Sequence, residues 1–198
     1  HHMQHVLFPA LERMGVKAEL EIIRPGYVPR GGGIIQVKIE PVGALKPLIR
    51  LRQGRVTEIR GIALSSHLKT QRVSQRLAET CQKILANKGY QVSIETQWDE
   101  TALQAGAGLA IWAEMDSGCR LGADQAGQRG RSSESIGQHV ARSLLEDIEA
   151  GATVDRYLAD QLIIYAALAS GVTEYLIPHP TEHVETNLWL VEKFGAKA

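Results

Sequence analysis

The sequence predicts an α+β fold in which a smaller α/β domain interrupts an outer unit. Three observations support this prediction. A helical segment at 4–14 precedes stretches at 17–23, 34–40 and 48–51 that alternate or extend in the manner of strands. The order strand–helix–strand–strand–helix then follows over residues 57–149. A helix–strand–helix pattern returns in the last part of the chain, as expected if the outer unit resumes there.

The inner segment contains its own start and stop signals. Ser65 or Ser66 could cap a long helix that Gly89 closes. The stretch 116–133 is rich in Gly, Arg and Ser, which predicts a loop. The other expected elements here are strands at 56–64, 92–96 and 107–115 and a helix at 134–149.

The last part of the chain supplies a helix at 153–170, a strand at 172–177 and a closing helix at 184–194. We therefore predict a split outer unit, residues 4–56 and 150–198, around an inserted domain at 57–149. Residues 1–3, His-His-Met, are typical of an expression-tag remnant. Because the chain then starts inside a helix, we expect an N-terminal portion of the complete protein to be missing.

The composition excludes several classes of function. Of the 198 residues, 44% are apolar, enough for a core without covalent staples. The 22 basic and 22 acidic residues cancel, which argues against a general nucleic-acid coat but allows a local phosphate-binding cleft. No apolar run is long enough to span a membrane, and no signal peptide is visible. Cys81 and Cys119 form no CxxC pair, which favours a cytoplasmic protein with reduced thiols.

Three polar residues near the C-terminus are candidates for a binding site. Tyr157, Asp160 and Gln161 are spaced i, i+3, i+4, so they share one face of a helix. The helix is apolar nearly all round, and polar groups on such a helix need partners. A nucleotide would supply them. The alternative is a solvated polar face on an amphipathic helix.

A histidine stands where a helix start favours a phosphate. His183 lies just ahead of the expected helix at 184–194, and backbone N–H groups at a helix start attract anions. Beside a bound phosphate, the imidazole could be a nucleophile, a general acid or a hydrogen-bond donor. The alternative is a capping or structural histidine. His179 competes for the same role.

Arginines supply further candidate phosphate contacts. Arg30 sits in a Pro/Gly-rich turn between two expected strands, and a rigidly held guanidinium can fork onto phosphate. The glycines of that turn indicate a tight hairpin. A second group, which could contact a nucleic-acid backbone but more simply forms a solvated face, consists of Arg50, Arg52, Arg55 and Arg60. The carboxylates show no metal-ligand spacing, so we assign no protein ligand to a metal.

Four phrases of the sequence together resemble the RNA 3′-terminal phosphate cyclases. The resemblance covers essentially the whole chain after residue 3 and departs at Pro25, where the family usually has a basic residue. The phrases are GYVPRGGGI at 26–34, GADQAGQRGRSSESIG at 122–137, YLADQLIIYAALASG at 157–171 and HPTEHVETNLWLVEKF at 179–194.

This resemblance implies a fold of repeated α/β sandwich units, each a sheet covered by two helices, with a smaller inserted α/β domain. It implies a ligase that uses ATP to convert an RNA 3′-phosphate into a 2′,3′-cyclic phosphodiester. The route passes through a covalent histidine–AMP adduct and then an RNA-adenylate. The family nucleophile falls on His183, and the nucleotide-binding residues fall on Tyr157, Asp160 and Gln161.

The implied partners are RNA 3′-phosphate ends and ATP, with magnesium or manganese accompanying the ATP. The resemblance also implies that this chain is a C-terminal fragment, so we expect little or no complete turnover from it alone. A non-catalytic cyclase-like protein acting in ribosome biogenesis is the alternative, and the presence of His183 favours the enzyme. The oligomeric state stays open, with a homodimer as one outcome.

Overall fold

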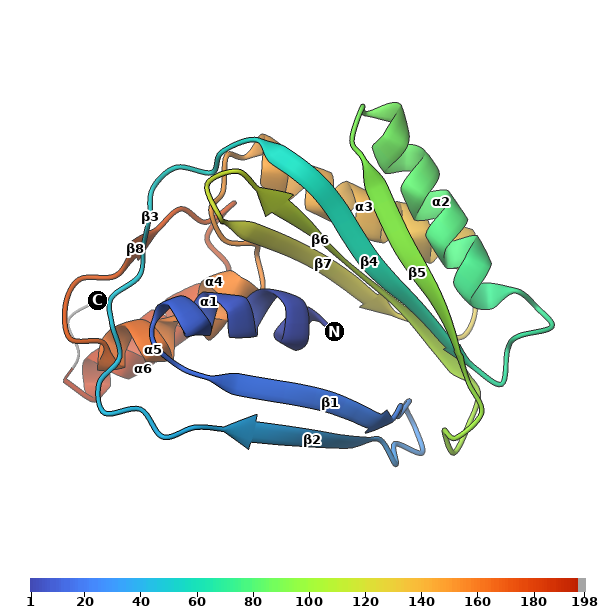
Figure 1. The fold of residues 1–198 in the computed structure, drawn as a ribbon, viewed down its shortest axis with the longest axis horizontal. Helices are drawn as coiled ribbons and strands as arrows, with labels where there is room; N and C mark the ends of the chain where they lie inside the picture. The colour runs from blue at the N-terminus through green and yellow to red at the C-terminus, as the bar shows by residue number, and fades with distance from the viewer. Residues whose placement is uncertain (196–198) are drawn as a thin grey trace.

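The computed structural model describes residues 1–195 and confirms the mixed α+β class (Figure 1). The helices within these residues are the π-helix η1 at Met3–Leu7, α1 at Phe8–Arg13, α2 at Val73–Asn87, α3 at Ser133–Glu149, α4 at Leu158–Gln161, α5 at Ile163–Leu168 and α6 at Glu182–Lys193. The strands are β1 at Ala18–Arg24, β2 at Ile34–Ile39, β3 at Ile49–Arg50, β4 at Val56–Ser66, β5 at Val92–Asp99, β6 at Gly106–Met115, β7 at Arg120–Ala126 and β8 at Glu174–Tyr175.

The largest sheet described has the strand order β5-β4-β6-β7. Strand β4 pairs in parallel with β5 and antiparallel with β6, which in turn pairs antiparallel with β7. Helices α2 and α3 lie together on one face of this sheet (Figure 1). Leu77 and Cys81 of α2 and Leu144 of α3 are fully buried there against Ile111 and Leu121. This first core is therefore a sheet covered by two helices.

The opposite face of the same sheet is covered by helices from the two ends of the chain. Ile62 of β4 and Trp112 of β6 share a second core with Val6 of η1 and with Leu158 and Leu162 of the α4 region. Neighbouring residues of β6 therefore enter different cores, which explains why the strand is apolar along nearly its whole length. This packing brings residues from opposite ends of the chain together beneath the sheet (Figure 1).

Two smaller sheets complete the described structure. Strands β1 and β2 form the antiparallel hairpin that the alternating pattern predicts. Strand β3 pairs in parallel with β8 through Ile49↔Glu174 and Arg50↔Tyr175, so residues on either side of segment 57–149 lie in one sheet. The division into an outer unit and an inserted domain stays a prediction.

Several apolar side chains of β2 are exposed, namely Ile34, Ile35, Val37 and Ile39.

Two predictions for segment 57–149 are wrong. Residues 120–126 are a strand rather than part of a loop, because pairing with β6 outweighs the Gly-rich composition and buries Leu121 and Ala123. Helix α2 starts at Val73 and not after Ser65 or Ser66. Both serines end β4 and pair with β5, so they cannot cap the helix.

Three predictions for the C-terminal segment are also corrected. The expected helix at 153–170 is divided into α4 and α5, and its first residues form a turn. The expected strand at 172–177 is limited to β8. Helix α6 starts at Glu182 and not at residue 184, because the Thr181 side chain caps it. His183 is therefore the second residue of the helix. Across residues 1–195, no helix has both the length and the apolarity needed to cross a membrane.

Candidate active site

The buried carboxylate of Asp155 positions the start of α4. One carboxylate oxygen, Oδ1, accepts the N–H groups of Tyr157 and Leu158, both at 2.9 Å. The other, Oδ2, accepts the N–H of Gly122 in β7 at 2.8 Å. The imidazole Nε2 of His2 lies 3.1 Å from the same carboxylate, whose side chain is fully buried. Asp155 therefore ties α4 to the large sheet and to the N-terminal helix.

The pair of His2 and Asp155 predicts a pH-dependent contribution to stability. Burial opposes the charged imidazole, yet the hydrogen bond and charge of Asp155 outweigh it, so the pKa of His2 lies above its ordinary value of 6.5. A raised folded-state pKa contributes stability that is fully present below 6.5 and is lost as the pH rises through the folded-state pKa.

We expect the free energy of unfolding of the unmodified chain, relative to that of His2→Gln, to fall as the pH rises from 6.5. Denaturant unfolding of both chains across this range measures the difference. The two chains must be compared because burial also lowers the pKa of the N-terminal amino group below 8.0 and that of His5 below 6.5, and a lowered pKa has the opposite effect on stability. Identical pH slopes in the two chains would contradict the prediction.

The first turn of α6 offers unpaired backbone donors. Thr181 is extended, and its hydroxyl accepts the N–H of Val184 at 3.2 Å. Among residues 1–195, no acceptor is recorded for the N–H groups of Glu182 and His183. Such free donors at a helix start attract an anion, in competition with the Glu182 and Glu185 carboxylates of the same turn.

Helices α4 and α6 meet beside His183. The Asn187 side chain donates to the carbonyl oxygen of Asp160 at 3.5 Å. His183 and Asn187 are one helical turn apart on the same side of α6, so the imidazole also lies on the side that faces the end of α4. Asp160 is half-buried, whereas Gln161 and His183 are exposed. The structure thus places the His183 side of α6 against the backbone of Asp160 in α4.

Tyr175 supports this junction from β8. Its hydroxyl donates to the carbonyl oxygen of Ala159 at 2.9 Å. Burial, assisted by the negative charge of Asp160, raises the pKa of Tyr175 to about 12. The phenol therefore stays protonated near neutral pH and remains a donor to α4.

Tyr157 faces a different neighbour. Its ring meets the ring of His2 edge to face, with centroids 5.8 Å apart. The pKa of Tyr157 lies above its ordinary value, mainly because the phenol is partly buried, although 38% of the residue is exposed. The expectation that an all-round apolar helix would bury these polar groups is wrong, because Tyr157 and Gln161 reach solvent where α4 is short.

Arg30 is not brought to this junction. Its guanidinium donates to the carbonyl oxygen of Leu103 at 3.3 Å, in the turn between β5 and β6. In Figure 1 the β1–β2 turn lies at the opposite end of the molecule from α6. Gly31 and Gly32 have positive φ angles of 65° and 71°, which confirms that these glycines form a tight turn. A contact between Arg30 and phosphate stays a prediction.

His179 is exposed just before Pro180, outside α6. Within the part of the chain that the structure describes, no three or more His, Cys, Asp or Glu side chains gather in a way that could hold a metal ion. Asp155 is the residue of this region that the sequence analysis undervalued. An Asp shortly ahead of an apolar helical run is a helix-start signal, and this signal would have found it.

Comparison with known proteins decides the family. The family described as "RTC: RNA 3'-terminal phosphate cyclase" matches residues 1–198. The chain belongs to this family. The relatives named RNA 3'-terminal phosphate cyclase include one from Thermococcus kodakarensis, 40% identical over 194 residues that cover 98% of this chain and 55% of the relative.

Two other cyclases of this name show the same pattern of coverage. The Pyrobaculum neutrophilum protein is 34% identical over 193 residues, which are 98% of this chain and 55% of the relative. The Thermococcus onnurineus protein is 38% identical over 197 residues, which are 99% of this chain and 56% of the relative. The chain therefore spans about half the length of the curated cyclases that it matches.

Proposed function

We propose that this chain carries the nucleotidyl-accepting histidine of an ATP-dependent RNA 3′-terminal phosphate cyclase. The protein to which it belongs would convert an RNA 3′-phosphate into a 2′,3′-cyclic phosphodiester. Family membership supports the reaction class. The single structural observation that carries the proposal is the setting of His183: an exposed imidazole in the first turn of α6, beside two free N–H groups and the end of α4.

The first step we propose is transfer of AMP to His183. A ring nitrogen of the neutral imidazole attacks the α-phosphorus of ATP and forms an N–P bond. The bond to pyrophosphate breaks, and the imidazole loses its proton. The free N–H groups of Glu182 and His183 are suited to stabilise the negative charge on the phosphate oxygens during this transfer.

The next two steps use the stored phosphoramidate. An oxygen of the RNA 3′-phosphate attacks the phosphorus of AMP, the N–P bond breaks as the leaving imidazole takes up a proton, and an RNA-adenylate forms. The neighbouring 2′-hydroxyl then attacks the RNA phosphorus, loses its proton and expels AMP. No net change of the protein remains after the cycle.

Residues of α4 would bind the nucleotide. Gln161 is exposed at the end of α4 and can hydrogen-bond to a base or ribose, and the partly exposed Tyr157 ring can contact the base. The Asp160 carboxylate would orient either the imidazole or the nucleotide. A magnesium or manganese ion would accompany the triphosphate. We assign no residue of this chain as its ligand.

A cytoplasmic location is part of the same proposal. Both cysteines are buried and free, as suits a reducing compartment. Burial raises the pKa of Cys81 to about 12, so this thiol is chemically inert near neutral pH.

The first step is the one to test, because the chain spans about half of its relatives. We expect ATP labelled on its α-phosphate to label the chain in the presence of magnesium, with at most one label per chain. The bond should be acid-labile and base-stable, as a phosphoramidate is. ATP labelled on its γ-phosphate should leave no label. An α-label that base removes, or no label at saturating ATP, would contradict the proposal for this chain.

A further inference from the structure

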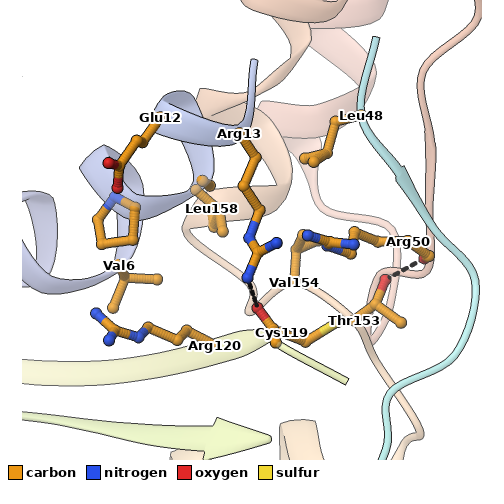
Figure 2. A pocket seen from close by; sticks show the side chains of 13 residues that line it. Val6, Glu12, Arg13, Leu48, Arg50, Cys119, Arg120, Thr153, Val154 and Leu158 are labelled. Atoms are coloured by element: carbon orange, nitrogen blue, oxygen red, sulfur yellow. Dashed lines mark hydrogen bonds between the residues drawn. The ribbon is translucent and has the colours of Figure 1, made fainter. Parts of the chain in front are cut away.

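A hollow beside α4 is lined by three arginines and by Leu158 (Figure 2). Its volume is about 360 Å³, within the usual size range of ligand clefts. Arg13 comes from α1, Arg50 from β3 and Arg120 from the start of β7. We call this the arginine hollow. Its apolar floor consists of Val6, Cys119, Val154 and Leu158, all nearly fully buried.

The guanidinium groups of the hollow are only partly used by the protein. Arg13 donates through Nη2 to the carbonyl oxygen of Gly118 at 3.3 Å, which leaves most of its N–H groups free. The backbone of Arg50 is held by the Thr153 hydroxyl at 2.7 Å, and within residues 1–195 no partner is recorded for its guanidinium. Figure 2 shows the Arg13 and Arg50 groups directed into the same space.

The charge of the hollow is unbalanced. Its lining contains three arginines and a single carboxylate, Glu12. Arg120 forms an ion pair at 3.0 Å with Glu114, which does not line the hollow, and it also donates to the carbonyl oxygen of His5. Arg13 and Arg50 thus place two positive charges against at most one negative charge. An anion bound between them would relieve this repulsion and accept several charge-assisted hydrogen bonds.

We propose that the arginine hollow binds a phosphate group, and that the source of this group is an internal phosphate of the RNA strand. Planar guanidinium groups donate paired hydrogen bonds to the oxygens of phosphate, which favours such an oxyanion over a halide ion. The choice of RNA rests on the proposed function. Leu158 of α4 lines the hollow, whereas the carbonyl oxygen of Asp160 in the same helix accepts a hydrogen bond from Asn187, one turn from His183 on α6. One strand could therefore contact both sides of α4.

The test is the binding of a short fluorescent single-stranded RNA with a 3′-phosphate, measured by anisotropy over a range of salt concentrations. We expect Arg50→Gln and Arg13→Gln each to weaken binding about threefold to tenfold and to lower the salt slope by about one. Arg50→Lys keeps the charge and should keep the slope. Arg142→Gln is the matched control, because this exposed arginine lies on α3, across the sheet from the hollow.

The outcomes separate the source of the phosphate. If Arg50→Gln weakens the direct binding of inorganic phosphate or pyrophosphate, measured by isothermal titration calorimetry, but leaves RNA affinity unchanged, the hollow binds a free anion and the RNA assignment is overturned. Equal losses in Arg50→Gln and Arg142→Gln would show a general charge effect and would also overturn it, as would the absence of RNA binding. Circular dichroism melting of each variant shows whether a loss reflects unfolding instead.

The proposed function is judged by a different measurement. If ATP labels the chain but RNA binding does not depend on the arginines, the proposal for His183 is supported and the proposal for the arginine hollow is rejected. If RNA binding depends on the arginines but ATP does not label the chain, the proposal for the hollow is supported and the proposal for His183 is rejected. The two proposals can therefore fail separately.

Discussion

Replacing His183 with alanine is expected to reduce labelling by α-labelled ATP at least about a hundredfold, to background. The substitution removes the only atoms that could form the N–P bond in our proposal. It should affect folding little, because His183 is exposed and its helix is capped by Thr181. Labelling and unfolding are measured on the same preparations, so a lost label can be assigned to lost chemistry.

Two matched histidine variants sharpen this experiment. His179→Ala removes the competing candidate, and His139→Ala removes an exposed histidine on the distant helix α3. We expect both variants to label like the unmodified chain. Loss of the label in His179→Ala with full labelling in His183→Ala would assign the nucleophile to His179 and contradict our proposal.

The largest loss of stability is expected from Asp155→Ala. This change leaves three backbone N–H groups, those of Gly122, Tyr157 and Leu158, without their acceptor, and it leaves His2 without its counter-charge. Because Asp155 is fully buried, water replaces it poorly. Removing one partner of a buried ionic pair costs about 3–5 kcal/mol, and we expect a loss of this size in the free energy of unfolding.

Denaturant unfolding followed by circular dichroism measures this loss. Asp155→Asn keeps the shape and one acceptor oxygen, so it should lower the free energy of unfolding less than Asp155→Ala does. We expect a loss of about 1–3 kcal/mol. Glu79→Ala is the control, since this exposed carboxylate pairs with Arg72 on the surface, and it should change stability by less than about 1 kcal/mol. An Asp155→Ala chain as stable as the control would show that Asp155 does not hold α4 in place.

The elements with strong local signals were predictable from sequence. Helix α3 has an apolar stripe and a Ser132 cap that accepts the N–H of Ser135, both of which act within a few residues. Strand β6 is predictable because a long apolar run is typical of a strand buried on both faces. Strand β7 was missed because its pairing with β6, and not its own composition, makes it a strand.

The candidate site shows the same division. His183, Asp160 and Gln161 could be named from the sequence because they stand in short phrases that resemble a family. The contact between Asn187, on the His183 side of α6, and Asp160 depends on the packing of α4 against α6, which no local pattern encodes. The arginine hollow was out of reach for the same reason, because Arg13, Arg50 and Arg120 come from three separate elements.

The sequence by itself determined the α+β class, the family resemblance and the identity of the candidate nucleophile, because periodicity, caps and short motifs act over a few residues. Only the tertiary structure decided that Asp155 anchors α4, that Tyr157 faces His2 while Asn187 of α6 contacts Asp160, and that three arginines share a hollow. These facts depend on contacts between residues more than a hundred positions apart, such as His2 with Asp155. Such contacts are set by packing of the whole chain, so no local pattern encodes them.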